Sequence, residues 1–94
     1  MENTAEKAII TVVGKDTIGI IAKVSAYLSE SKVNILDISQ TIVSGFFNMM
    51  MIVDTAACSK DFDSFSDELT KIGEDMGCII HAQREEIFDK MHRI

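Results

Sequence analysis

The first part of the chain is a run of apolar residues with the character of a strand. In Lys7–Val13 the only polar residue after the lysine is Thr11, and apolar side chains stand at both odd and even positions. β-branched residues dominate the run and Gly14 follows it, which is typical of a strand and its end. Because neither face of such a strand suits water, we expect a central strand that is covered on both faces.

The pattern then changes to the helical period. From Ile18 onwards, apolar residues recur at spacings of three and four. The stripe consists of Ile21, Val24 and Leu28, widened by Ile20 and Tyr27. Asp16 or Thr17 is a suitable N-cap, because its side-chain oxygen can accept a hydrogen bond from an otherwise unpaired helical N–H. We therefore predict an amphipathic helix from about Ile18.

Two further strands follow as a hairpin. Asn34–Val43 alternates between apolar and polar residues, which predicts a half-exposed strand. Ser44 and Gly45 favour a tight turn. Phe46–Asp54 is again apolar at both parities, so it is predicted to pair with the preceding strand from the middle of the sheet.

The second helix is predicted after a loop that extends to Asp61. Ser64 and Asp67 resemble a capping box, with aspartate in place of the usual glutamate. The apolar stripe of this helix is formed by Phe65, Leu69, Ile72 and Met76. Gly77 suits the position that ends the helix. Residues 78–83 then read as a fourth strand.

The predicted order is βαββαβ, an α+β ferredoxin-like sandwich with an antiparallel four-stranded sheet and a short C-terminal helix. The domain spans residues 7–84, and 85–94 form an amphipathic helical tail with Ile87, Met91 and Ile94 on one side. Right-handed crossovers place both main helices on one face, with the first and third strands in the middle. The other face also receives apolar residues, so the tail, a second subunit or both must cover it.

Composition excludes several classes of function. The 94 residues carry a net charge of -6, which repels nucleic acid. No apolar run approaches the length of a membrane span, and the N-terminus has no secretory pattern. The two cysteines do not make a disulfide framework. We therefore expect a cytoplasmic protein without nucleic-acid or membrane partners.

No group of residues predicts catalysis or a cofactor. Cys78 and His81 have the spacing of a metal pair, but residues three apart on a strand point to opposite faces. Alternation likewise divides Met49–Met51 between the two faces, where these side chains fill the interior better than they would bind copper. No nucleophile–base pair is visible, so the chain is not predicted to be an enzyme.

Gly19 stands in the first turn of the predicted helix, where glycine is less favourable than alanine by about 1 kcal/mol. It permits another group to approach the backbone closely. That group is either the packed second strand or a ligand, since a helix N-terminus favours anions such as a carboxylate.

The segment Val12–Ser39 resembles the start of an ACT domain. It has a strand, then Asp16-x-x-Gly19 with two apolar residues, a helix, and Asn34-Ile35 opening the next strand. The resemblance extends over about residues 7–83 and is strongest to small stand-alone ACT proteins related to the glycine-cleavage regulator. It implies a non-catalytic regulatory module that pairs as a homodimer or larger assembly and acts on an unknown partner protein.

The resemblance also implies a binding site for an amino acid or similar small molecule. That site lies where the loop between the first strand and first helix meets the second strand of a neighbouring chain. Carried over by position, it would be formed by Asp16, Ile18, Gly19, Ile20, Asn34, Ile35 and Leu36. Asp16 suits a ligand ammonium group, or is occupied as an N-cap. Asn34 offers a donor and an acceptor, or serves as a turn residue. The alternative function is a protein-interaction module of the same fold without ligand binding.

Overall fold

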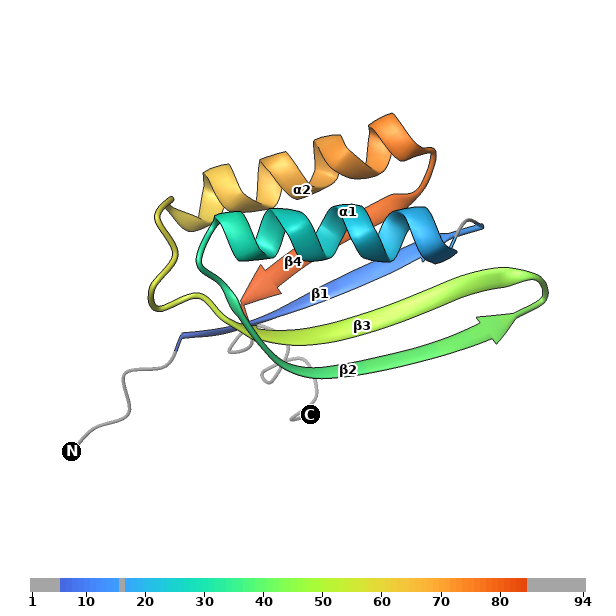
Figure 1. Cartoon of the computed structure of the whole chain (residues 1–94), viewed down its shortest axis with the longest axis horizontal. Coiled ribbons are helices and arrows are strands. Elements are labelled where there is room, and N and C mark those ends of the chain that lie inside the picture. The colour runs from blue at the N-terminus through green and yellow to red at the C-terminus, as the bar shows by residue number, and fades with distance from the viewer. Residues whose placement is uncertain (1–5, 16, 85–94) are drawn as a thin grey trace, which may run out of the picture.

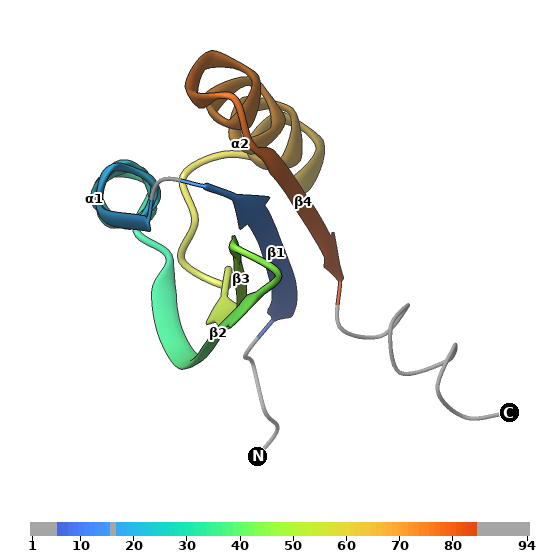
Figure 2. The ribbon, with the colours of Figure 1, turned by 90° about the vertical axis from the view of Figure 1, so that its right-hand side faces the viewer.

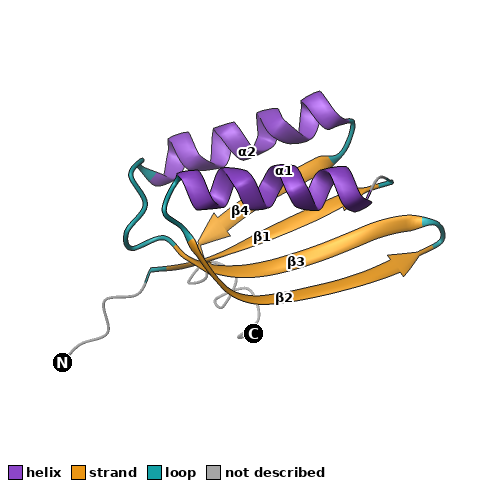
Figure 3. Cartoon of the chain, viewed as in Figure 1, coloured by secondary structure: helices purple, strands orange, loops and turns teal. Residues whose placement is uncertain are grey.

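The computed structural model describes residues 6–15 and 17–84, which form a sheet with two helices on one face (Figure 1). The strands are β1 (Lys7–Gly14), β2 (Asn34–Val43), β3 (Phe46–Asp54) and β4 (Ile79–Arg84), and the helices are α1 (Thr17–Glu30) and α2 (Phe62–Met76). This is the predicted βαββαβ order, in two layers (Figure 3). The predicted tail helix of 85–94 and the predicted cap Asp16 lie outside the described residues.

The sheet has the order β2-β3-β1-β4, and every neighbouring pair is antiparallel. The prediction that the first and third strands are central is therefore confirmed. Lys7 lies opposite Asp54 at one end of the sheet, and Gly14 lies opposite Phe47 at the other end. Seen from the side, both helices lie on the same side of the strands (Figure 2). The two edge strands are β2 and β4.

The core lies between the helices and the sheet, and alternation along the central strands selects its members. The strands contribute Ala8, Ile10, Val12, Phe47, Met49, Met51, Val53 and Ile80, and the helices contribute Ile20, Val24, Leu28, Phe65 and Leu69. Ile21 and Tyr27, expected within the stripe of α1, are only partly buried at its margin. The three consecutive methionines are divided as predicted, since Met50 is exposed on the other face.

The turns follow the local chemistry. Ser44 and Gly45 both have positive φ, 54° and 83°, which is the conformation of a tight hairpin turn whose twist matches the strands. Gly77 ends α2 in the left-handed conformation at φ 74°. Its N–H and that of Cys78 donate to carbonyl groups in the last turn of the helix. Both predictions made from these glycines are confirmed.

The predicted capping box of α2 is wrong. The helix begins at Phe62, and the N-cap is Asp61, whose carboxylate accepts a hydrogen bond from the backbone N–H of Ser64 at 3.3 Å. The earlier start brings Phe62 into the first turn, where its ring lies 6.0 Å from the ring of Phe65. Packing of that aromatic pair supports the additional residues of the helix.

The face of the sheet opposite the helices is called the open face below. Neither described helix lies on it, yet the central strand β1 places Ile9 and Val13 there. Ile9 is only 4% exposed, whereas Val13 is 39% exposed. The expectation that β1 is covered on both faces is therefore met at Ile9 and not at Val13.

Candidate functional site

The first group of predicted site residues lies at the start of α1. Ile18 is 81% exposed in the first turn, and Gly19 is half-buried beside it. Ile20 is buried in the core, so its side chain is directed away from the surface. The first turn contains no acidic residue, which leaves the positive end of the helix dipole without a carboxylate side chain in that turn.

The second group lies at the start of β2. Asn34 is exposed, Ile35 is half-buried against the core, and Leu36 is exposed. Asn34 pairs with Asp54, which in turn pairs with Lys7 at the beginning of β1. This group is therefore at the opposite end of the sheet from Gly14, where α1 begins.

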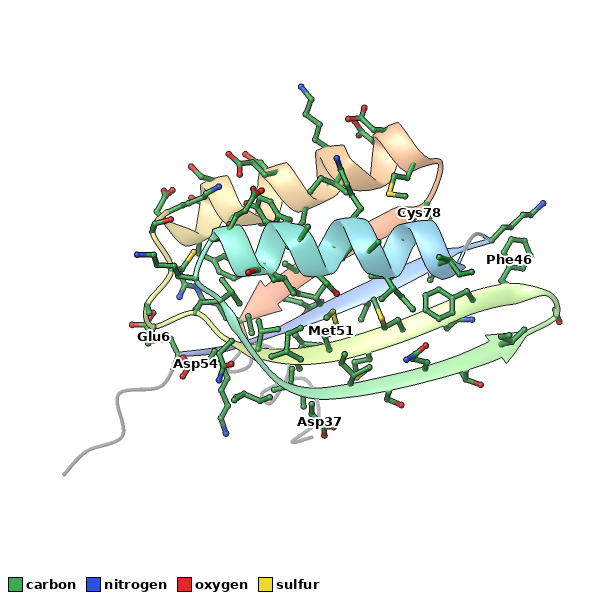
Figure 4. The ribbon with its side chains drawn as sticks, viewed as in Figure 1. Glu6, Asp37, Phe46, Met51, Asp54 and Cys78 are labelled. Carbon is green, nitrogen blue, oxygen red and sulfur yellow. The ribbon has the colours of Figure 1, made fainter. Side chains whose placement is uncertain are left out.

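A single chain does not bring the two groups together. The first group lies at the start of α1 and the second lies just beyond its end, so the 14 residues of the helix, about 21 Å long, separate them. Strand β2 then runs back beneath the helix (Figure 1). Phe46 and Cys78 lie at the end of the molecule where α1 begins, and Glu6 and Asp54 lie at its opposite end (Figure 4). A site that contains both groups requires a second chain.

An apolar groove adjoins the first group. It has a volume of about 520 Å³ and lies between the first two turns of α1 and the second half of β2. It is lined by Ile18, Ile21, Gln40, Thr41, Ile42 and Phe47. Ile42 is 70% exposed, so the groove has no cover on the outer side of β2 among the described residues. Sequence reasoning missed its β2 side, although the apolar members of that strand were the available signal.

A β-bulge determines which side chains of β2 face this groove. Ile35 lies opposite Val53, but the next pair is Asp37 with Ile52, so Leu36 is the extra residue. The Asp37 carboxylate accepts a hydrogen bond from the N–H of Ile38 at 2.9 Å, directly after the bulge. The shift places Ile38 and Ile42 on the helix side of the sheet.

Strand β2 also has a free side. Among the described strands it is hydrogen-bonded only to β3. Four apolar residues along it are exposed, namely Leu36, Ile38, Ile42 and Val43. An apolar edge strand of ten residues is a template for pairing with another strand. Ile42 belongs both to this edge and to the groove, so the two adjoin.

At the other end of the helices, a polar cluster joins α1, α2 and the preceding loop. The Tyr27 hydroxyl donates to Glu68 Oε1 at 2.6 Å, and Lys60 Nζ lies 2.7 Å from the same oxygen. Lys60, and then Tyr27, hold the pKa of Glu68 below its ordinary value. Burial, and then Glu68, raise the pKa of Tyr27. These groups stabilise one another, which indicates a structural clamp between the helices.

Cys78 and His81, which have the spacing of a metal pair, lie on different sides of the sheet. Cys78 is buried just before β4, and burial raises the pKa of its thiol, which keeps it protonated. His81 lies opposite Thr11 on the open face, so the two residues are directed apart as predicted. No three metal-ligating side chains gather within residues 6–15 and 17–84. Neither described helix combines the length and apolar character that a membrane span requires.

Known proteins resemble this chain over its whole described length. A sequence model of the ACT domain matches residues 6–83. A UPF0237 protein of Bifidobacterium longum is 64% identical over 88 residues, which is 94% of this chain and 98% of that protein. Any span of 88 residues in a chain of 94 includes residues 7–88, so the match extends past the end of the ACT domain to at least residue 88.

Solved structures agree. An ACT domain protein from Streptococcus pneumoniae superimposes with a TM-score of 0.79 and 43% identity, over 89% of this chain and 94% of that chain. A candidate glycine cleavage system transcriptional repressor has a TM-score of 0.71 at 20% identity, over 87% of this chain and 47% of that one. The second comparison shows the fold alone.

Proposed function

This chain belongs to the ACT domain family, and on that premise we propose that it is a non-catalytic regulatory module that senses an amino acid or a similar small metabolite. The observation that carries the proposal is the apolar groove between the exposed first turn of α1 and the edge strand β2. The groove lies beside a helix N-terminus, which attracts a carboxylate, and its walls suit an apolar side chain.

The complete site is proposed to form between two chains. If two β2 strands pair antiparallel about a twofold axis between Ile38 and Ser39, Asn34 of one chain lies beside Val43 of the other. The start of one β2 strand then adjoins the groove of its neighbour. The two groups of site residues, which are far apart in one chain, meet across this interface. Exposed apolar residues on both β2 and α1 support such a dimer, because they would otherwise stay in water.

Within this site each side chain has a chemical role. Asp16 is proposed to take the ligand ammonium group, and the start of α1 its carboxylate. Asn34 of the partner subunit offers a donor and an acceptor. Ile18 and Ile42 contact the ligand side chain. A zwitterion is neutral overall, so the net charge of -6 does not oppose its binding.

The cytoplasm is the proposed location. Both cysteines, Cys58 and Cys78, are unpaired, which suits a reducing compartment. The domain is proposed to pass its signal to another protein, as the regulatory role implies.

A thermal-shift screen of the twenty amino acids tests this function. A ligand at ten times its dissociation constant stabilises the folded state by about 1.4 kcal/mol. For a domain of this size, the melting temperature should rise by roughly 5–10 °C. If no amino acid or related metabolite raises it, the second candidate stands, a protein-interaction module without a ligand. The exposed edge of β2 favours that candidate, since a strand of another protein can pair there.

A further inference from the structure

The open face of the sheet is buried at one end and exposed at the other. Val13 and Ile79, which pair with each other, are 39% and 59% exposed. Ile9 stands four residues before Val13 on the same strand and face, and it is only 4% exposed. Its neighbour on β3, Ile52, is half-buried. The side chain of Ile9 is therefore shielded from water although both described helices lie on the opposite face.

The last described strand, β4, ends at the Ile9 end of the sheet. The last pairs of β4 are Gln83 with Ile9 and Arg84 with Ala8. The Arg84 guanidinium lies 4.5 Å over the ring of Phe62 on the helix side, which fixes the end of the strand. Strand β4 therefore ends at Arg84, opposite Ala8 and one residue from Ile9 along β1.

The sequence of residues 85–94 suits a cover for that end. At 100° per residue, Ile87, Phe88, Met91 and Ile94 fall within an arc of about 120° on a helix, and the other six residues are charged or histidine. Ten helical residues span about 15 Å, whereas the eight residues of β1 span about 27 Å. A helix of this length would cover one half of the open face and would leave the half around Val13 uncovered, which agrees with the 39% exposure of Val13.

We propose that residues 85–94 fold back as a short helix, called the tail helix below, onto the open face of their own chain. The apolar side of the tail helix would cover Ile9 and Ile52 through Ile87, Phe88 and Met91. The segment is tethered next to its binding surface, so its effective concentration there exceeds that of a second copy at micromolar concentration. The match to the Bifidobacterium longum protein continues past the ACT domain into this segment.

Nuclear Overhauser effects in the full-length protein test the proposal directly. The δ1 methyl group of Ile9 should show contacts to the ring of Phe88. A mixture of labelled and unlabelled chains with isotope filtering separates contacts within one chain from contacts between chains. Contacts within the chain support the tail helix. Contacts only between chains would assign the cover to a second copy, and no contacts at Ile9 would reject a cover by this segment.

A pair of matched variants gives an independent test. Phe88→Glu places a charge on the apolar side of the tail helix, and His92→Glu places one on its polar side. The first should lower the melting temperature and increase the fluorescence of a dye that binds exposed apolar surface, and the second should do neither. Equal behaviour of the two variants would overturn the proposal. If Phe88→Glu does not fold, the contacts at Ile9 in the unmodified protein still decide.

Discussion

Gly14 and Cys78 lie so close together that a Cβ atom on Gly14 would stand 2.6 Å from the Cβ atom of Cys78. The same Cβ atom would stand 2.8 Å from Cδ1 of Ile20, in the first two turns of α1. The end of β1, the start of α1 and the residue before β4 therefore meet at a backbone without a side chain. Close packing at this end of the core depends on that glycine.

Replacement of Gly14 by alanine should destabilise the fold by about 1–3 kcal/mol, because a well-packed core does not accept an added methyl group without displacement. Urea denaturation measures the change. The added methyl group would meet the Cβ atom of Cys78, which alanine keeps and glycine lacks. The double variant Gly14→Ala, Cys78→Ala should therefore recover no stability, whereas Gly14→Ala, Cys78→Gly should recover part of the lost stability. A Gly14→Ala variant as stable as the parent would show that the three elements separate easily.

The protein should be a dimer or larger at micromolar concentration, and Ile42→Glu should shift it towards the monomer. The substitution places a charge in the apolar surface formed by β2 and the groove. Light scattering should give at least twice the chain mass of 10.4 kDa for the parent. Ile79→Glu, at an exposed site on the other edge strand, is the control and should keep the assembly. A parent mass of one chain would contradict pairing through β2.

Gly19→Val should abolish any ligand-dependent rise of the melting temperature while leaving a folded dimer. A branched side chain at this position would occupy space beside the start of α1 that the proposed ligand needs. Lys23→Val makes the same exchange for valine on the exposed side of the helix and should keep the response. Unfolding of Gly19→Val would instead show that the glycine serves packing of α1.

Two aspartates should make the fold sensitive to acid. Hydrogen bonds from the N–H groups of Ala56 and Glu6 hold the pKa of Asp54 below its ordinary value of 3.8. Hydrogen bonds from Ser64 do the same for the pKa of Asp61. Stability from a carboxyl group with a lowered pKa is fully present above its unfolded-state pKa and disappears as the pH falls through its folded-state pKa.

The urea concentration at the midpoint of unfolding should therefore decrease as the pH is lowered from 5 to 3. In the double variant Asp54→Asn, Asp61→Asn this fall should be smaller, because asparagine keeps an acceptor oxygen but does not take up the proton. Asp75→Asn, at the other end of α2 from Asp61, is the control, because it removes one negative charge without removing either aspartate. Parallel midpoint curves for the parent and the double variant would exclude these aspartates as the cause.

The sequence predicts elements well where the side-chain pattern itself determines them. Alternation in β1 and β3, the helical stripes and the turn at Ser44-Gly45 all depend on neighbours within a few residues. The role of Gly14 was not predictable in this way, since it depends on Cys78 at the far end of the chain. The start of α2 was misplaced because Asp61 and Ser64 both suit a cap, and only the packing of Phe62 decides between them.

The candidate site shows the same limit. The two predicted groups are near one another in sequence, but α1 places Ile18 to Ile20 and Asn34 to Leu36 at opposite ends of the described molecule. The β2 side of the groove depends on which way the side chains of that strand point, and the bulge at Leu36 puts Ile35 and Ile38 on the same side of the sheet, which strict alternation does not allow. A pattern of alternation alone does not contain this extra residue.

The bulge also has an evolutionary consequence. Loss of the single codon for Leu36 would remove the extra residue and leave a regular strand in which Ile38 and Ile42 still lie on the helix side. Loss of the codon for Ser39, in the regular part of the strand, would instead shift the residues after it by one position, so that Thr41 would enter the groove and Ile42 would turn to the open face. The strand therefore tolerates a deletion at the bulge, whereas a deletion three residues later would exchange an apolar surface for a polar one in a single genetic step.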